Sequence, residues 1–156
     1  MTDPLRILHL SDTHLYGDGR LHYGLVDTLA ALDRVLVRAG ESEAVDLVVA
    51  SGDLSDAGSA ASYRLLRERL EPWAAERGAV VAYAMGNHDL PDAFEDVLGP
   101  RETEFEVGGF RVVTVDTTVA RAGYGRVDGA RLERLRDTLH TPSANGTIVV
   151  LHHPPV

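Results

Sequence analysis

Four short apolar runs of this chain end in polar side chains of the kinds that bind metal ions. They are Asp12 and His14 after Leu5–Leu10, Asp53 and Asp56 after Val45–Ser51, Asn87 and His88 after Ala79–Met85, and His152 and His153 after Thr147–Leu151. Carboxylate, imidazole and amide oxygen together suit borderline divalent ions such as Mn, Fe, Co or Zn. Because ligands bind outside the carboxyl ends of strands in open α/β sheets, we expect the four segments to converge on one crevice.

The residue types also indicate how ions would share these ligands. Asp12 and His14 are two residues apart in an extended segment, so both side chains can point into one coordination sphere. Asp53 has two carboxylate oxygens and can bridge two ions, while Asn87 offers an amide oxygen and His152 a neutral imidazole. The ordered set therefore predicts a metal site in which Asp53 can contact two ions.

Each motif taken alone also has a structural interpretation. Asp53 and Asp56 precede a helix expected from residue 59 and can cap it. The Gly-Asn-His-Asp segment over residues 86–89 has the composition of an ordinary turn. Gly52 and Gly86 stand before candidate ligands, where the backbone must turn sharply and approach the ions closely. Four such motifs in order favour the metal site.

The other polar candidates are expected to have structural or supporting roles. Asp89 should support the site without touching an ion, and His153 should orient a neighbour or face the substrate. His9 lies inside an apolar run and is expected to be a hydrogen-bonded core histidine. His22 and His140 are expected at the surface.

The elements that must position these residues can be read from apolar periodicity. The four runs above and a fifth over Phe110–Asp116 are nearly continuous, which is typical of strands buried on both faces. Apolar residues at helical spacing predict helices over about 22–39, 59–77 and 128–140. Pro72 should kink or stop the second of these, and Gly108-Gly109 predicts a β-hairpin over Thr103–Asp116. The alternation predicts an α/β fold, parallel at first, with a mixed or second sheet later.

Composition limits the classes of protein to be considered. The 156 residues suit one domain, taken as 1–156, and 44 % hydrophobic residues can form a core. A net charge of −9 without a basic run argues against binding of duplex nucleic acid. Cysteine is absent, and neither a secretory signal nor an apolar run of roughly 18 residues is visible, so we expect a cytoplasmic protein without a membrane span.

The ordered motifs resemble those of a known family. Asp12-x-His14, Gly52-Asp53-x-x-Asp56, Gly86-Asn87-His88-Asp89 and His152-His153-Pro154-Pro155 look like the calcineurin-like metallophosphoesterases. The intervening sequence is similar to the bacterial class III 3′,5′-cyclic-nucleotide phosphodiesterases, and the resemblance extends over essentially the whole chain. It implies a four-layer αββα sandwich with a dinuclear metal centre between the loops.

The resemblance also implies a role for each matching residue. Asp12 and His14 would bind the first ion, Asp53 would bridge both, and Asn87 and His152 would bind the second. His88 would protonate the leaving alkoxide with Asp56 orienting it, and Asn87 and His88 would contact the substrate. The implied partners are a small phosphodiester substrate and, as one option for oligomeric state, a second copy of the chain.

The sequence departs from the family pattern in one respect. The family completes its site with a later Gly-His-x-His motif, which this chain does not contain, so we expect a C-terminally incomplete sandwich. The leading functional hypothesis is a metal-dependent phosphodiesterase acting on 3′,5′-cyclic AMP or a related cyclic nucleotide. The alternatives are a phosphomonoesterase or nuclease on the same scaffold, and an inactive truncated copy.

Overall fold

The computed structural model describes residues 4–41 and 44–154, so Pro155 of the closing motif lies outside the described residues. The helices and strands follow one another as β1 Ile7–Leu10, α1 Thr28–Ala39, β2 Leu47–Ser51, α2 Ala60–Ala75, β3 Val80–Ala84, α3 Pro91–Leu98, β4 Glu104–Val107, β5 Phe110–Thr114, α4 Gly129–His140 and β6 Gly146–Val150. The chain is therefore an α/β protein.

The strands form two separate sheets. In the first, β1, β2 and β3 are all parallel, with Leu10 opposite Ala50 and Ser51 opposite Ala84. In the second, β4 and β5 form an antiparallel hairpin around Gly108-Gly109, and β6 pairs with β5 in parallel. The predicted hairpin and the prediction of a later mixed or second sheet are confirmed.

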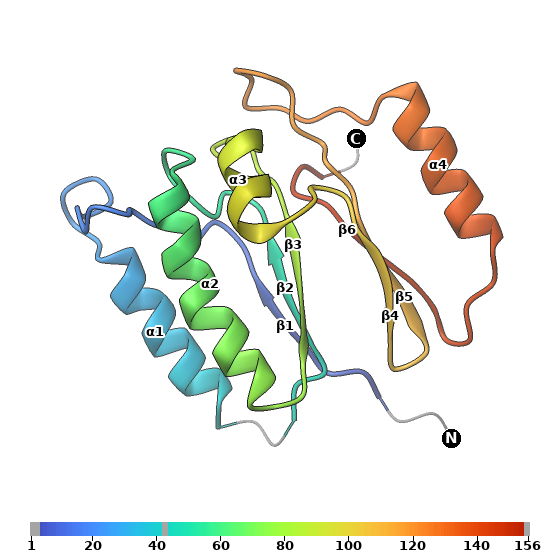
Figure 1. Ribbon diagram of the computed structural model, residues 1–156, viewed down its shortest axis with the longest axis horizontal. Helices are drawn as coiled ribbons and strands as arrows, with labels where there is room; N and C mark the ends of the chain where they lie inside the picture. Colours follow the sequence, from blue (N-terminus) through green and yellow to red (C-terminus); the bar gives the residue numbers. More distant parts are fainter. Residues whose placement is uncertain (1–3, 42–43, 155–156) are drawn as a thin grey trace.

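The two sheets pack face to face between layers of helices (Figure 1). Apolar side chains from both sheets form the central core, namely Leu47, Val49, Ala82, Ala84, Val112 and Val150. Helices α1, α2 and α3 cover the other face of the first sheet, where a larger apolar cluster lies. Helix α4 lies on the outer side of the second sheet, and Arg111 of β5 donates hydrogen bonds to the carbonyl oxygens of Thr138 and Thr141.

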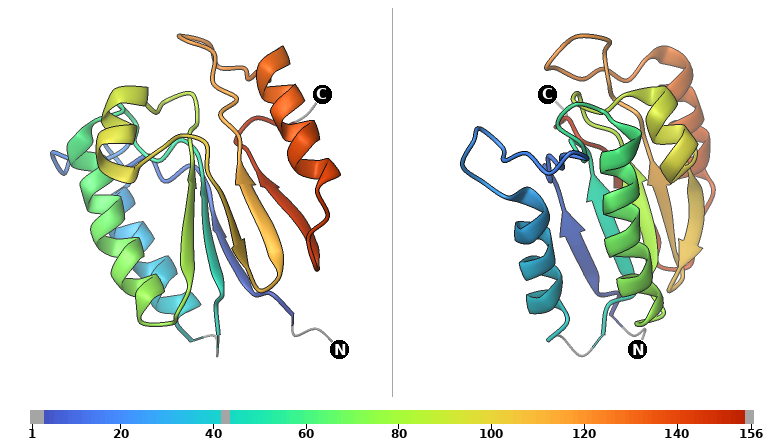
Figure 2. Two further views of the ribbon diagram at one scale, coloured as in Figure 1. Left: turned by 45° about the vertical axis from the view of Figure 1, so that its right-hand side comes forward. Right: turned by 60° about the vertical axis from the view of Figure 1, so that its left-hand side comes forward.

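The segments that follow β1, β2, β3 and β6 lie at the same end of the molecule (Figure 2). Beyond the ends of β1 and β2, the two chains still run side by side, because the backbone N–H of Asp12 donates to Gly52 and that of His14 donates to Asp53. A backbone bridge joins Leu15 to Ser55 one step further. The convergence expected from the parallel strands is thus present, and the second sheet contributes to it.

Several predicted boundaries and burials differ from the structure. The first helix begins at Thr28 rather than near residue 22, because Asp27 caps it by accepting a hydrogen bond from Ala30 N–H, and Leu25 is 82 % exposed before it. Pro72 does not stop α2, which continues to Ala75. Strand β1 is an edge strand with exposed residues, so its expected burial on both faces was wrong.

Helix α3 was not predicted at all. It has only eight residues, too few for apolar spacing to show a period, although Pro91 at its first turn is a typical helix start.

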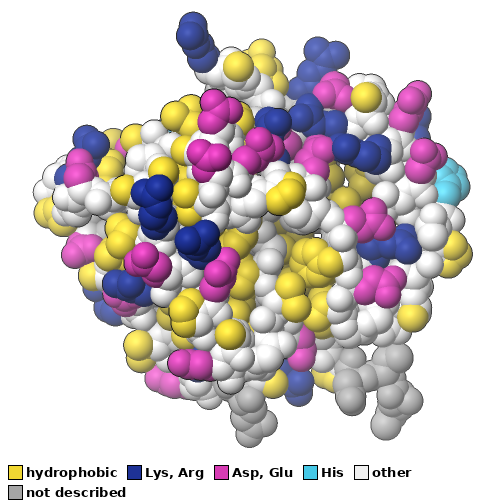
Figure 3. All heavy atoms as spheres, in the orientation of Figure 1, with side chains coloured by type: hydrophobic (Ala, Val, Ile, Leu, Met, Phe, Trp, Pro, Cys, Tyr) yellow, Lys and Arg dark blue, Asp and Glu magenta, His cyan; other side chains and the backbone are white. Residues whose placement is uncertain are grey.

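The face of the molecule shown in Figure 3 carries both positive and negative side chains. Arginine side chains are interspersed there with Asp and Glu side chains. Within residues 4–41 and 44–154, the helices are all too short or too polar to cross a membrane.

Candidate metal centre

Asp53 is the residue around which the other predicted ligands gather. The residue is 4 % exposed, and Oδ1 of its carboxylate accepts a hydrogen bond of 2.8 Å from the backbone N–H of His88. Oδ2 lies 3.8 Å from Nε2 of His14 and 3.6 Å from Nε2 of His152. Oδ2 of Asp53 therefore faces one imidazole that follows a strand of the first sheet and one that follows a strand of the second.

Two groups of potential ligands share Asp53. One contains His14, Asp53 and His88, and the other contains Asp12, Asp53 and His152, with the ligand atoms of each group within 4.8 Å of one another. Asn87 is half buried and lies in the turn beside His88. The structure thus brings four of the five predicted metal ligands, Asp12, His14, Asp53 and His152, close together, and it adds His88 to one of the groups. Asn87 occupies the turn next to them.

The ring orientations fit metal binding. Nδ1 of His152 lies 2.8 Å from the carbonyl oxygen of Ser51, to which it can donate, and Nδ1 of His14 faces Oδ1 of Asp56 at 3.2 Å. Metal-binding histidines commonly donate one ring N–H to a carbonyl or carboxylate and use the other nitrogen as ligand. In both histidines the remaining nitrogen is Nε2, which faces Asp53. The donor set and its orientation therefore suit divalent ions.

The pKa values of Asp53 and His152 follow from the same contacts. A side-chain hydrogen bond with Asp53 raises the pKa of His152 to about 9, against the opposing effect of burial. Burial acts to raise the pKa of Asp53, but the contacts with His152 and the backbone N–H of His88 hold it below its ordinary value. Metal binding at these two side chains would therefore release protons, so metal affinity would depend on pH.

The backbone is strained at these ligands. Asp12, His14 and Asp53 have φ values of +56°, +41° and +49°, in the left-handed region that side chains other than glycine seldom adopt. Each such residue costs roughly 1–2 kcal/mol. Strain of this kind gathers at functional sites, where the surrounding structure imposes a particular direction on a side chain.

Two glycines allow the backbone to pack closely against the side chains of His152 and Asp53. A Cβ atom at Gly52 would lie 2.6 Å from the His152 ring, and one at Gly86 would lie 2.3 Å from the Asp53 carboxylate. Gly52 also has a φ of +94°. The sharp turn expected at Gly52 is present, and both glycines allow a close approach to ligand side chains; a close approach to ions stays a prediction.

Asp89 joins the loop after β2 to the turn after β3. Its buried carboxylate accepts hydrogen bonds from the backbone N–H groups of Leu54, Ser55 and Gly86 and from the hydroxyl of Tyr63. Burial raises the pKa of Asp89, and the four donors oppose that effect. The structure therefore gives Asp89 the supporting role that was expected.

The contact between His88 and Asp56 is mostly through the backbone. Nδ1 of His88 lies 2.9 Å from the carbonyl oxygen of Asp56 and 3.9 Å from its carboxylate. The carboxylate lies closer to His14 and to His22. The hydroxyl that begins α2 as its cap belongs to Ser59.

His22 is the functional candidate that sequence reasoning missed. It was expected at the surface, but its side chain is 19 % exposed and Nδ1 lies 3.4 Å from Oδ1 of Asp56. No strand leads into His22 and no repeated spacing marks it, so the sequence offered no signal. His140 is exposed as expected, and His9 is exposed rather than buried, with Nε2 hydrogen-bonded to Ser51.

His153 is hydrogen-bonded to the segment after β5 and belongs to neither group of potential ligands around Asp53. Nδ1 makes a 2.7 Å hydrogen bond with the hydroxyl of Thr117, and the ring packs against Gly125. His153 thereby fixes the segment after β5 beside His152, in keeping with an orienting role.

The comparisons with known proteins all point to phosphoesterases. A family model described as calcineurin-like phosphoesterase matches residues 5–156. The chain is 38 % identical to a cAMP/cGMP dual specificity phosphodiesterase of Mycobacterium tuberculosis, and the alignment covers 96 % of this chain and 50 % of that relative. It is 40 % identical to a probable cyclic nucleotide phosphodiesterase of Rhodococcus erythropolis, over 96 % of this chain and 52 % of that relative. A probable cyclic nucleotide phosphodiesterase of Synechococcus is 34 % identical over 97 % of this chain and 59 % of its own length. The chain spans about half the length of the curated relatives it matches.

Proposed function

Because this chain belongs to the calcineurin-like phosphoesterase family, we propose that it provides a dinuclear-metal site for hydrolysis of a small phosphodiester, 3′,5′-cyclic AMP or a related cyclic nucleotide. The observation that supports this most is the position of Asp53, whose carboxylate belongs to both groups of potential ligands. The choice of a cyclic nucleotide rests on the names of the similar proteins.

In the proposed centre, the two ions would share Asp53. Asp12 and His14 would complete the ligands of one ion, and Asn87 and His152 those of the other. Bound divalent ions would supply Lewis-acid polarisation of the phosphoryl oxygens. The four-layer sandwich, of which the described sheets and helices are a part, would hold these ligands at the carboxyl ends of β1, β2, β3 and β6.

His88 is proposed to protonate the departing oxygen. Its side chain is 43 % exposed, so substrate can reach the ring. With Nδ1 donating to the Asp56 carbonyl, Nε2 is the nitrogen that would hold the transferable proton. The backbone N–H of His88 donates to Asp53, which fixes the turn relative to the ligands. His88 also belongs to a potential ligand group, so proton transfer and metal binding are two roles that an experiment must separate.

The test compares hydrolysis of cyclic AMP, bis(p-nitrophenyl) phosphate and p-nitrophenyl phosphate by the Mn²⁺-loaded protein. We expect turnover of the two diesters to exceed that of the monoester, and Asp53→Asn to abolish turnover and lower the bound Mn²⁺. Asp96→Asn on the exposed face of α3 makes the same change of charge away from the site and should leave both unchanged.

Two outcomes would contradict the proposal. Preferred turnover of the monoester would indicate a phosphomonoesterase on the same scaffold. Retention of full Mn²⁺ content by Asp53→Asn would show that Asp53 does not bridge two ions.

A further inference from the structure

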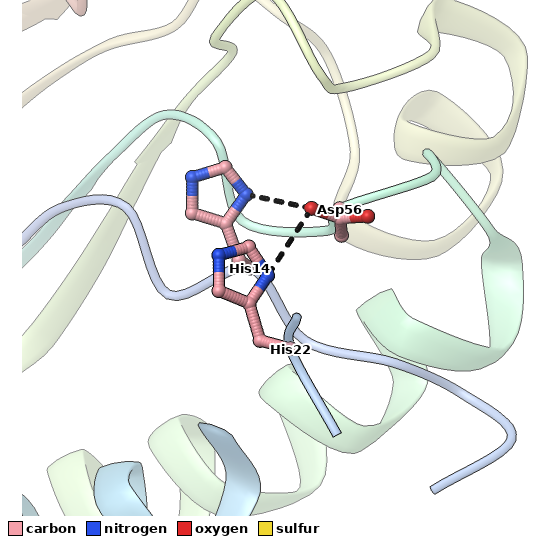
Figure 4. A group of neighbouring side chains, drawn as sticks. All are labelled: His14, His22 and Asp56. Atoms are coloured by element: carbon pink, nitrogen blue, oxygen red, sulfur yellow. Dashed lines mark ion pairs between the residues drawn. The ribbon is translucent and has the colours of Figure 1, made fainter. Parts of the chain in front are cut away.

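The loop between β1 and α1 places a histidine against the metal centre (Figure 4). The rings of His14 and His22 lie one above the other, and Nδ1 of each points to the same carboxylate oxygen of Asp56, at 3.2 Å and 3.4 Å. The ring centroids are 5.0 Å apart, with 29° between the planes. The hydroxyl of Tyr16 lies 3.1 Å from Nδ1 of His22 and completes the group.

The ring nitrogens of His14 and His22 therefore converge on one carboxylate oxygen of Asp56. The Tyr16 hydroxyl, which is hydrogen-bonded with His22, also makes a side-chain hydrogen bond with Asp56. Nδ1 of His14 is buried and, among the described residues, has no partner with hydrogen-bond geometry, although Asp56 is only 3.2 Å away. Whether His14 can donate to Asp56 thus depends on how firmly that carboxylate is held.

The position of His22 is fixed by a tight turn of its own. The N–H of His22 donates to Val26 at 2.8 Å, and the N–H of Leu25 donates to His22 at 3.0 Å. Tyr23 and Gly24 have φ values of +50° and +69°, which for Tyr23 is an unfavourable conformation. Because the Tyr23 side chain is 84 % exposed, its own burial does not explain this strain. The turn does, however, direct the His22 ring onto His14.

We propose that His22 is a positioning residue of the metal centre, holding the Asp56 carboxylate and the His14 ring so that Nε2 of His14 faces Asp53. This inference rests on the proposed function, because it assumes that His14 binds an ion. A contact outside the ligands that orients a metal-binding histidine is typically worth 10–100-fold in metal affinity.

A separate ion held by His14, His22 and Asp56 would explain the same cluster less well. Nε2 of His14 already faces Asp12 and Asp53, at 3.9 Å and 3.8 Å. A second ion on Nδ1 would require the His14 ring to lose both ring protons and bridge two cations. Donation of one N–H to Asp56 avoids that requirement.

The test measures Mn²⁺ binding to the metal-free protein by isothermal titration calorimetry. His22→Phe keeps a ring to stack on His14 but removes both ring nitrogens, and we expect it to weaken Mn²⁺ binding 10–100-fold. His22→Asn places an N–H donor near the position of Nδ1 and should restore affinity to within a few-fold of the unmodified protein. His140→Phe, on the exposed end of α4, is the matched control and should change nothing.

Two further measurements separate positioning from other roles. The metal-free His22→Phe protein should unfold at the same denaturant concentration as the His140→Phe control, because a general structural role would lower stability as well. In Asp56→Asn protein, His22→Phe should cause little additional loss of affinity, since the carboxylate that it holds is already gone.

The outcome that would overturn this inference differs from the one that would overturn the proposed function. Equal Mn²⁺ affinity of His22→Phe and the unmodified protein would refute it while leaving the proposed function intact. Loss of one whole equivalent of Mn²⁺ would instead make His22 a ligand. No Mn²⁺ binding by the unmodified protein would overturn the proposed metal centre and this inference together.

Discussion

Replacing Asp89 by Asn should destabilise the protein although the two side chains have the same shape. Oδ1 of Asp89 accepts from Leu54, Ser55 and Tyr63 at 3.0–3.1 Å, and Oδ2 accepts from the Gly86 N–H at 2.9 Å. All the partners are donors, so the amide group of an asparagine would place its own N–H against one of them.

The expected cost can be worked from these contacts. If the amide nitrogen replaces Oδ2, the buried N–H of Gly86 loses its partner, which costs about 1–3 kcal/mol. The three remaining bonds would lose the charge of their acceptor, at roughly 1 kcal/mol each. Removal of a buried charge offsets part of this, since burial raises the pKa of Asp89. We therefore expect a net loss of about 3 kcal/mol.

Urea unfolding followed by circular dichroism measures this loss. With a slope of about 2 kcal/mol per molar, the midpoint should fall by roughly 1.5 M with the slope unchanged. Asp96→Asn, an exposed change of the same kind on α3, should stay within about 0.5 kcal/mol of the unmodified protein. An Asp89→Asn protein as stable as that control would refute the reasoning, because its donors would then not need a carboxylate.

Three further predictions follow from the geometry of the centre. His88→Ala should lower turnover of a poor-leaving-group diester by about 10²–10⁴-fold, and by less for bis(p-nitrophenyl) phosphate, whereas an equal loss on both would indicate a ligand role. Gly52→Ala should weaken Mn²⁺ binding measured by calorimetry, because its Cβ would lie 2.6 Å from the His152 ring at a φ of +94°; unchanged affinity would contradict the close approach. The pKa of His152 is raised to about 9 from 6.5, so its pairing with Asp53 stabilises the metal-free protein below about pH 6.5 and is lost as pH rises through 9. His152 should make the free energy of unfolding larger at pH 6 than at pH 10 by an amount on the order of 3 kcal/mol. His152→Ala should remove that part of the difference between the two pH values.

Much of the centre could be predicted from the sequence because parallel strands end at one edge of a sheet. Asp12, Asp53 and Asn87 each follow a strand of the first sheet, so their proximity needed only the strand assignments. The two sheets and three of the helices followed from apolar periodicity in the same way. Helix α3 was too short for that signal, and the burial of β1 depended on its place at the edge, which local sequence does not encode.

The sequence by itself determined which residue types stand at the strand ends, whereas the tertiary structure decided which of them touch. Asp56 faces His14 and His22 through its carboxylate and His88 mainly through its backbone, although sequence reasoning paired it with His88 alone. His22 lies against that carboxylate, and the tight turn that follows it has Tyr23 and Gly24 in left-handed conformations. Contacts of this kind join residues of irregular loops, where no period of 2.0 or 3.6 residues sets the direction of a side chain. Their partners are therefore chosen by the packing of the whole chain.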